Sequence, residues 1–418
     1  MDLAKEMTKE QAVLDSMRSS YKNAVPNSFD SLSNTSLLKL ESLEFPTTKL
    51  EYWKYTRTGQ IANKEWKFGG LENIDLPENL PVSKNRLVFV NGHFDAKRSS
   101  LPTAEGLTIL PFAKSGIAST IAQGEEDIFR AWNTAMPQDG YHIRVAKNKA
   151  IQDSLQIVFL YSGQNTISQP RSFVEVAENS ELKISEFHIH SAGSLAFANV
   201  HSEAVVGDNA HLKIDIVQHG SEKGFHLHET FGEQGKNCTY TQNTFTLSGN
   251  WTRNNSTIRL IDEHSECNLN GFYIPNLKEH IDNHTIVDHE KPNCVSNELY
   301  RGVLLDKSTG VFNGKVFVRQ DAQKTNAFQS NGNIIASDTA TMNSKPELEI
   351  YADDVKCSHG STTGQLDDEA MFYLMARGLS KENARKLLIN AFAEDVLEKL
   401  VNEDLREIIE DIIHTKLA

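Results

Sequence analysis

The sequence SELKI at residues 180–184 returns as AHLKI at residues 210–214, and this recurrence decides the fold. In both copies apolar residues alternate with polar ones, which is the period of a β-strand with one buried face. Weaker copies follow, and the anchor residues of the last strand in each copy are spaced by 30, 26 and 29 residues: Leu182, Leu212, Cys238 and Cys267. A repeat of this length is typical of a solenoid. Two short strands in each turn predict a β-helix, in which we expect Cys238 and Cys267 to be buried.

The β-like pattern extends from about residue 139 to residue 360, and both flanks differ from it. Residues 1–138 mix helical patterns with a hairpin at residues 86–95, whose Asn-Gly pair suits a type I′ turn. Residues 361–418 carry a short helix capped by Asp367 and two helices with broad apolar stripes. We therefore predict a mainly β fold. A parallel β-helix of residues 139–360 would lie between an N-terminal helical and mixed region, 1–138, and a C-terminal helical domain, 361–418.

The N-terminal region is expected to begin with two helices, at residues 2–21 and 36–45. The segment FPTTKLEYWKYT at residues 45–56 then combines aromatic side chains with lysines. These side chains could form a binding strip. The simpler interpretation is a loop whose aromatic residues anchor it to the body of the protein.

Composition narrows the class of protein. The 418 residues carry 56 acidic and 42 basic side chains, a net charge of −14 that argues against nucleic-acid binding. No apolar run is long enough to span a membrane, and the N-terminus has no signal-peptide pattern, so a cytoplasmic location is expected. The four cysteines form no CxxC pair, which fits a reducing compartment and argues against an ordinary ferredoxin site. Glycine-rich phosphate loops and the GxSxG motif are absent, so the chain is not expected to bind a nucleotide by itself.

The histidines suggest one metal-dependent alternative. His188 and His190, like His226 and His228, each place two imidazoles on one face of a strand. With Glu233, the second pair matches most of the first metal motif of cupins, and such a site suits iron or another divalent metal. The match then fails, because the glycine expected after Glu233 and the downstream third histidine are missing. A cupin-like oxygenase or isomerase that uses His226, His228 and Glu233 is therefore the alternative, and a solvated strand face is the favoured interpretation.

Cys357 and His359 lie at the seam between the β-rich region and the C-terminal helices. In an extended chain they point to the same side, about 6.6 Å apart, close enough to share one metal or one interface. Taken alone, two such residues are more simply interpreted as a small buried thiol and a turn histidine.

The sequence from Lys356 onward resembles the SufD subunits of the SUF iron–sulfur cluster assembly system, within the SufB/SufD family. The matching motifs are KCSHG at 356–360, TGQL at 363–366, FYL-x-ARG at 372–378, WKYT at 53–56 and NTA at 133–135. SufB-like chains resemble Cys-x-His-Glu-Ala in the first motif, whereas here Gly360 follows the histidine. The resemblance therefore favours the SufD side of the family.

This resemblance implies a right-handed parallel β-helix and a non-catalytic scaffold subunit with no stably bound cofactor. It implies a heterodimer with a SufB-like subunit, a docked SufC-like ATPase, and a homodimer when the chain is alone. ATP-driven movement would reshape the interface where a nascent cluster is built and iron is delivered. His359 and its neighbour Cys357 would meet that cluster or iron transiently at the SufB interface. The ATPase is expected to dock on the C-terminal helices at Phe372, Arg377, Leu387, Leu388 and Phe392.

Overall fold

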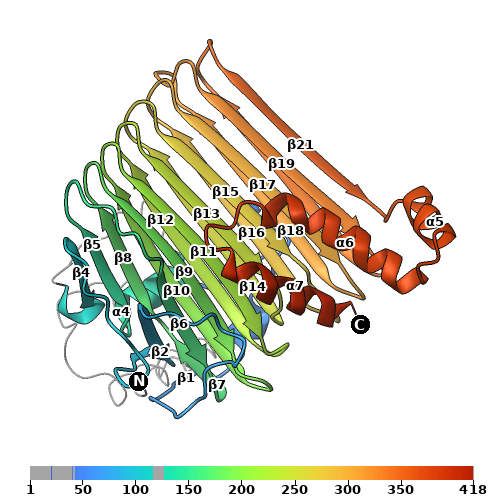
Figure 1. Ribbon diagram of the computed structural model, residues 1–418, viewed down its shortest axis with the longest axis horizontal. Coiled ribbons are helices and arrows are strands. Elements are labelled where there is room, and N and C mark those ends of the chain that lie inside the picture. The colour runs from blue at the N-terminus through green and yellow to red at the C-terminus, as the bar shows by residue number, and fades with distance from the viewer. Residues whose placement is uncertain (1–19, 21–39, 41–42, 116–126, 418) are drawn as a thin grey trace, which may run out of the picture.

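The computed structural model describes residues 20, 40, 43–115 and 127–417, and the helices expected at residues 2–21 and 36–45 fall almost wholly outside them. Within the described residues the body is a parallel β-solenoid of about eight turns (Figure 1). The predicted mainly β fold, a parallel β-helix with helical regions at its ends, is confirmed. None of the described helices combines the length and the hydropathy needed to cross a bilayer.

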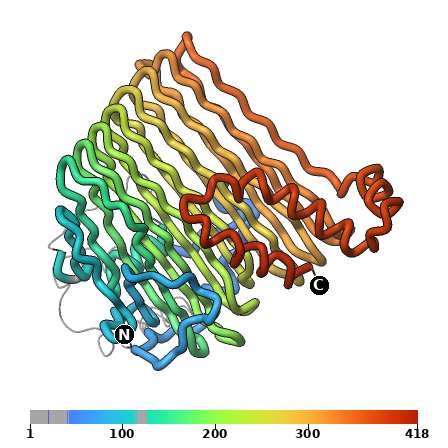
Figure 2. The backbone as a smooth tube through the Cα atoms, in the orientation of Figure 1, coloured from blue at the N-terminus to red at the C-terminus, as the bar shows by residue number. Residues whose placement is uncertain are grey.

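Two parallel sheets face each other, and the chain passes from one to the other in every turn (Figure 2). Sheet A contains β5 (Tyr141–Val145), β8 (Arg171–Val176), β10 (Leu195–Val206), β12 (Phe225–Gln234), β14 (Trp251–Leu260), β16 (His280–His289), β18 (Thr309–Val318) and β20 (Thr341–Ile350). Sheet B contains β6 (Leu155–Tyr161), β9 (Glu181–His190), β11 (His211–Gly220), β13 (Thr239–Thr246), β15 (Glu266–Tyr273), β17 (Val295–Leu304), β19 (Asn326–Ile335) and β21 (Lys356–Gly364).

Strands from the N-terminal region extend both sheets. The antiparallel hairpin of β2 (Arg86–Val90) and β3 (His93–Phe94) adds to sheet B, because β2 pairs with β6. Both turn residues have positive φ, 48° at Asn91 and 77° at Gly92, so the predicted Asn-Gly hairpin is confirmed. Sheet A gains β4 (Leu107–Pro111) beside β5, and the short strands β1 (Lys67–Phe68) and β7 (Gln164–Ser168) pair at its side.

The register corrects one anchor of the repeat. Leu182 pairs with Leu212, Leu212 with Tyr240, and Tyr240 with Cys267. Cys238 therefore precedes β13 as a turn residue, where its thiol donates to the carbonyl of Gly235 at 3.2 Å. Residues i and i+2 of a strand share a face, so alternation alone could not separate Cys238 from Tyr240. Both Cys238 and Cys267 are buried, as expected.

The inward side chains form the solenoid core, and its character changes along the strands. Near the start of each sheet B strand the inward residues are aliphatic, including Leu182, Ile184 and Leu212. Near the strand ends they become polar, as at His188 and Gln218, both of which are buried. Buried polar groups must find partners inside the solenoid, so this end of the core is a hydrogen-bonded network.

The outer face of sheet A is covered by N-terminal elements: η1 (Glu51–Trp53), α3 (Gly59–Ala62), η2 (Phe112–Lys114) and α4 (Ile128–Ala135). Trp53 is buried and stacks on Trp251 with ring centroids 6.5 Å apart. The Arg253 guanidinium lies 3.8 Å from the Trp53 ring centroid and pairs with Asp282 at 2.8 Å. The aromatic residues of this segment therefore anchor it to the solenoid.

The outer face of sheet B is covered by the C-terminal helices α6 (Lys381–Leu397) and α7 (Asp404–Lys416), whereas α5 (Asp368–Ala376) projects beyond the end of β21 (Figure 1). The predicted caps Asp367 and Ser380 accept backbone N–H groups at the starts of α5 and α6. Buried Asp215 on β11 accepts the N–H groups of Val401 and Asn402 at 3.0 Å, which fixes the connection between α6 and α7 to the sheet.

One interior carboxyl makes the stability of the solenoid depend on pH. Glu298 on β17 is buried and accepts hydrogen bonds from the Thr285 hydroxyl and the Gln329 amide. Burial raises the pKa of Glu298 from 4.5 to about 7. Because the folded state holds this proton more tightly than the unfolded state, the stabilisation is fully present below about pH 4.5 and is lost as pH rises through 7.

We therefore expect Glu298→Gln to raise the free energy of unfolding at pH 8 by roughly 3 kcal/mol relative to the wild type, with little change near pH 4.5. The measurement is the urea midpoint of each chain between pH 4.5 and pH 8. Glu266→Gln on exposed β15 serves as the matched control and should follow the wild type throughout. Parallel pH profiles of the wild type and Glu298→Gln would show that Glu298 does not carry this dependence.

Candidate functional site at the open end of the solenoid

The last turn of the solenoid leaves two strand edges unpaired within the described residues. Among them, β21 pairs with β19 alone and β20 with β18 alone. The N–H of Lys356 donates to the carbonyl of Thr325 at 2.9 Å, so alternate residues after Lys356 face β19. The intervening N–H groups point to the free edge and belong to Cys357, His359, Ser361 and Thr363. An open edge of this kind is a ready template for pairing with another chain.

The edge of β20 is less complete than that of β21. The N–H groups of Thr341 and Tyr351 donate to sheet partners on the β18 side, so the even-numbered residues of β20 face the free edge. Pro346 is one of them and offers no N–H there. The hydroxyls of Ser344 and Ser361 lie 2.7 Å apart and link the two strands. Strand β21 is therefore the better template for a partner strand.

Cys357 and His359 lie on one face of β21. They pair in register with Ala327 and Gln329, which are buried in the solenoid, so both continue inward rows into the last turn. Cys357 is partly buried and packs against the small cluster that includes Val316 and Ala327. Burial raises the pKa of its thiol, which keeps it protonated at neutral pH. His359 is exposed. Of the two, His359 is the accessible donor and Cys357 is mainly a packing residue.

The residues predicted for ATPase docking divide into two groups. Phe372 is 75% exposed and Leu387 is 48% exposed. Arg377 is also exposed, and its guanidinium lies 5.1 Å from the ring centroid of Tyr373. Leu388 is half-buried, and Phe392 packs against sheet B, where the Arg301 guanidinium lies 5.7 Å from its ring. The docking face available to a partner is therefore Phe372, Tyr373, Arg377 and Leu387.

The structure overturns the expectation of a solvated histidine face. His188, His226 and His228 are 0%, 3% and 3% exposed and point into the solenoid. The inward set that begins at Leu182 on β9 reaches His188 by strict alternation, so the burial signal was present in the sequence. Glu233 lies on the opposite face of β12 and pairs with Arg259. The cupin-like triad of His226, His228 and Glu233 is therefore not formed.

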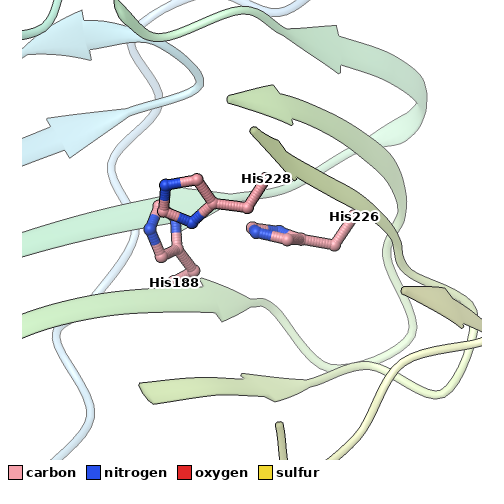
Figure 3. A group of neighbouring side chains, drawn as sticks. All are labelled: His188, His226 and His228. Carbon is pink, nitrogen blue, oxygen red and sulfur yellow. The ribbon is translucent and has the colours of Figure 1, made fainter. Parts of the chain in front are cut away.

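Sequence reasoning also missed that His188 joins the second histidine pair across the two sheets (Figure 3). The ring centroid of His188 lies 4.8 Å from that of His226 and 5.0 Å from that of His228. Pairing in register links strands within a sheet, whereas β9 and β12 belong to different sheets and meet only through the core. Burial lowers the pKa of His228 to about 3 and that of His226 further, so both imidazoles are neutral.

The fold and the open end place the chain in a known class, because the family model described as SUF system FeS cluster assembly, SufBD core domain, matches residues 159–392. The chain belongs to the SufBD family. It is 29% identical over 372 residues to the iron-sulfur cluster assembly protein SufD of Escherichia coli K12, with 87% of each chain covered. It is 31% identical over 392 residues to a SufBD family protein of Synechocystis, covering 86% of this chain and 85% of the relative. The chloroplastic protein ABCI7 of Arabidopsis thaliana is 27% identical over 418 residues, covering 95% of this chain and 87% of the relative.

Proposed function

We propose that this chain is a scaffold subunit of a SUF assembly complex, which pairs with a SufB-like subunit and docks a SufC-like ATPase. The observation that carries the proposal is the open last turn, where an unpaired strand presents the exposed imidazole of His359. Membership of the SufBD family and the similarity to the SufD protein of Escherichia coli support it.

The pairing step follows from the physics of an open sheet. A strand of the partner can add to β21, because main-chain hydrogen bonds then satisfy the free N–H groups of the edge. The same edge can pair with a second copy when the chain is alone. In either pair His359 lies at the seam between the two subunits. The nascent cluster or its iron is cargo at this seam, with an imidazole from this chain and thiolates from the partner as donors. The chain itself contributes binding and position rather than catalysis.

The docking step rests on α5 and the start of α6. Helix α6 buries Ile389, Ala393 and Val396 against sheet B, whereas Phe372 and Leu387 remain exposed. Large apolar side chains that stay exposed beside a packed helix mark a surface for a protein partner. Movement of a docked ATPase would then be transmitted along α5 to β21, which directly precedes it in the chain.

Replacing Phe372 by aspartate tests the docking step. We expect co-purification of a SufC-like ATPase to fall by about 30-fold, because an aromatic anchor at the centre of an interface is worth 2 kcal/mol or more. The measurement is the amount of ATPase retained by the full chain when the two are co-expressed, with circular dichroism as the check on folding.

Leu71→Asp is the matched control, since Leu71 is a similarly exposed apolar residue in the N-terminal region. That variant should retain the ATPase at the wild-type level. Equal retention by Phe372→Asp and the wild type would contradict docking on α5.

A further inference from the structure

The three imidazoles in the core form a group unlike the rest of the solenoid interior. His188 comes from β9, while His226 and His228 come from β12, so the group bridges sheets B and A. One ring nitrogen from each residue can be chosen so that all three lie within 4.8 Å of one another. Figure 3 shows the rings turned toward one another rather than stacked side by side in one plane.

His226 has no hydrogen-bonding partner that would explain its burial. It is 3% exposed, and neither of its ring nitrogens has a partner among the described residues. A buried polar group without a partner costs free energy and is uncommon in folded proteins. Two unpaired nitrogens on one ring, aimed at two other imidazoles, point to a missing ligand.

The other two histidines are held by neighbours, as metal-ligating histidines usually are. A carboxylate oxygen of Glu186 lies 2.6 Å from His188 Nε2, and the Tyr161 hydroxyl lies 2.8 Å from His188 Nδ1. The Ser202 hydroxyl lies 2.9 Å from His228 Nε2. A carboxylate that fixes the ring of a ligating histidine is the common outer contact of zinc sites.

We infer that His188, His226 and His228 form a binding site for a divalent first-row transition-metal ion inside the solenoid. Zinc takes imidazole nitrogens at about 2.0 Å, and Fe(II) and Co(II) accept the same donors. From a spacing of 4.8 Å or less, an inward movement of about 1 Å by each ring would close the site. A cavity of about 20 Å³ lined by Glu186, Ser202 and His228 has room for one water molecule as a fourth ligand.

This site is separate from His359 and does not rest on the proposed function. Strands β9 and β21 are six strand spacings apart in sheet B, which is roughly 30 Å. The bound ion would cross-link β9 to β12 and so join the two sheets within the core. Its expected effect is on the stability of the solenoid rather than on the open end.

The test uses the full chain without a histidine tag, stripped of metal by a chelator and then loaded with Co(II). Because the site is enclosed, Co(II) is added both to the folded chain and during refolding from urea. We expect one Co(II) per chain with the visible absorption of a four-coordinate ion, displacement by Zn(II), and a higher melting temperature in the loaded chain.

His226→Gln and His228→Gln should each lower Co(II) affinity at least 100-fold. His289→Gln is the matched control, because His289 is also fully buried but has Ser296 as a partner at 2.8 Å and lies outside the group. That variant should bind like the wild type.

X-ray absorption of the zinc-loaded wild-type chain needs no variant to fold and should show three imidazole nitrogens at about 2.0 Å. Binding of less than 0.1 Co(II) per chain under both loading conditions would overturn the inference. Undiminished binding by folded His226→Gln and His228→Gln, or an absorption spectrum without imidazole ligands, would overturn it as well.

Discussion

His359→Ala should lower iron–sulfur cluster delivery at least tenfold while the chain still folds and assembles. The side chain of His359 is exposed on the last strand, so its removal leaves no cavity in the core. What the variant loses is the imidazole that the open edge presents to the cargo at the subunit seam. A neutral imidazole is a good iron ligand, and its protonation abolishes ligation.

The measurement is the activity of an iron–sulfur enzyme in cells that depend on this chain, alongside gel filtration of the purified complex. Cys357→Ser should have a milder effect, because the partly buried thiol with its raised pKa is mainly a packing group. Ser358→Ala is the control for the strand itself, since Ser358 is exposed and lies on the opposite face of β21. A His359→Ala complex that forms normally and matures clusters at the wild-type rate would remove the proposed role of this histidine.

Much of the fold was predictable because a solenoid repeats one local pattern. Alternation around Leu182 and Leu212 reports which face of each strand is inward, and stacking follows from the repeat length. Alternation has a period of two, so it could not distinguish Cys238 from Tyr240, and it placed one anchor in a turn. The helix caps Asp367 and Ser380 were predictable because capping depends on local hydrogen bonds.

The functional groups were harder to predict because they depend on contacts between distant segments. The sequence contains both histidine pairs, but only the fold brings His188 against His226 across the two sheets. Likewise, β21 has the same alternating pattern as the strands before it. Its edge is open because α5 and α6 leave the sheet after it rather than starting another turn.

The open edge can be blocked with little change to the fold. The N–H of Thr363 faces the free side of β21, so Thr363→Pro removes a donor that has no partner strand among the described residues. Proline is tolerated on edge strands for this reason, and its ring hinders the approach of another strand. Thr363→Val keeps the N–H and nearly the same shape and is therefore the matched control.

The native mass of the complex that this chain forms when co-expressed with SufB-like and SufC-like subunits tests the central claim most directly. The wild-type chain and Thr363→Val should each be found with one SufB-like subunit and with the ATPase. Thr363→Pro should keep the ATPase, because α5 is unchanged, and should lose the SufB-like subunit. A Thr363→Pro chain that still forms the complete complex in the same yield would contradict pairing through the open end of the solenoid.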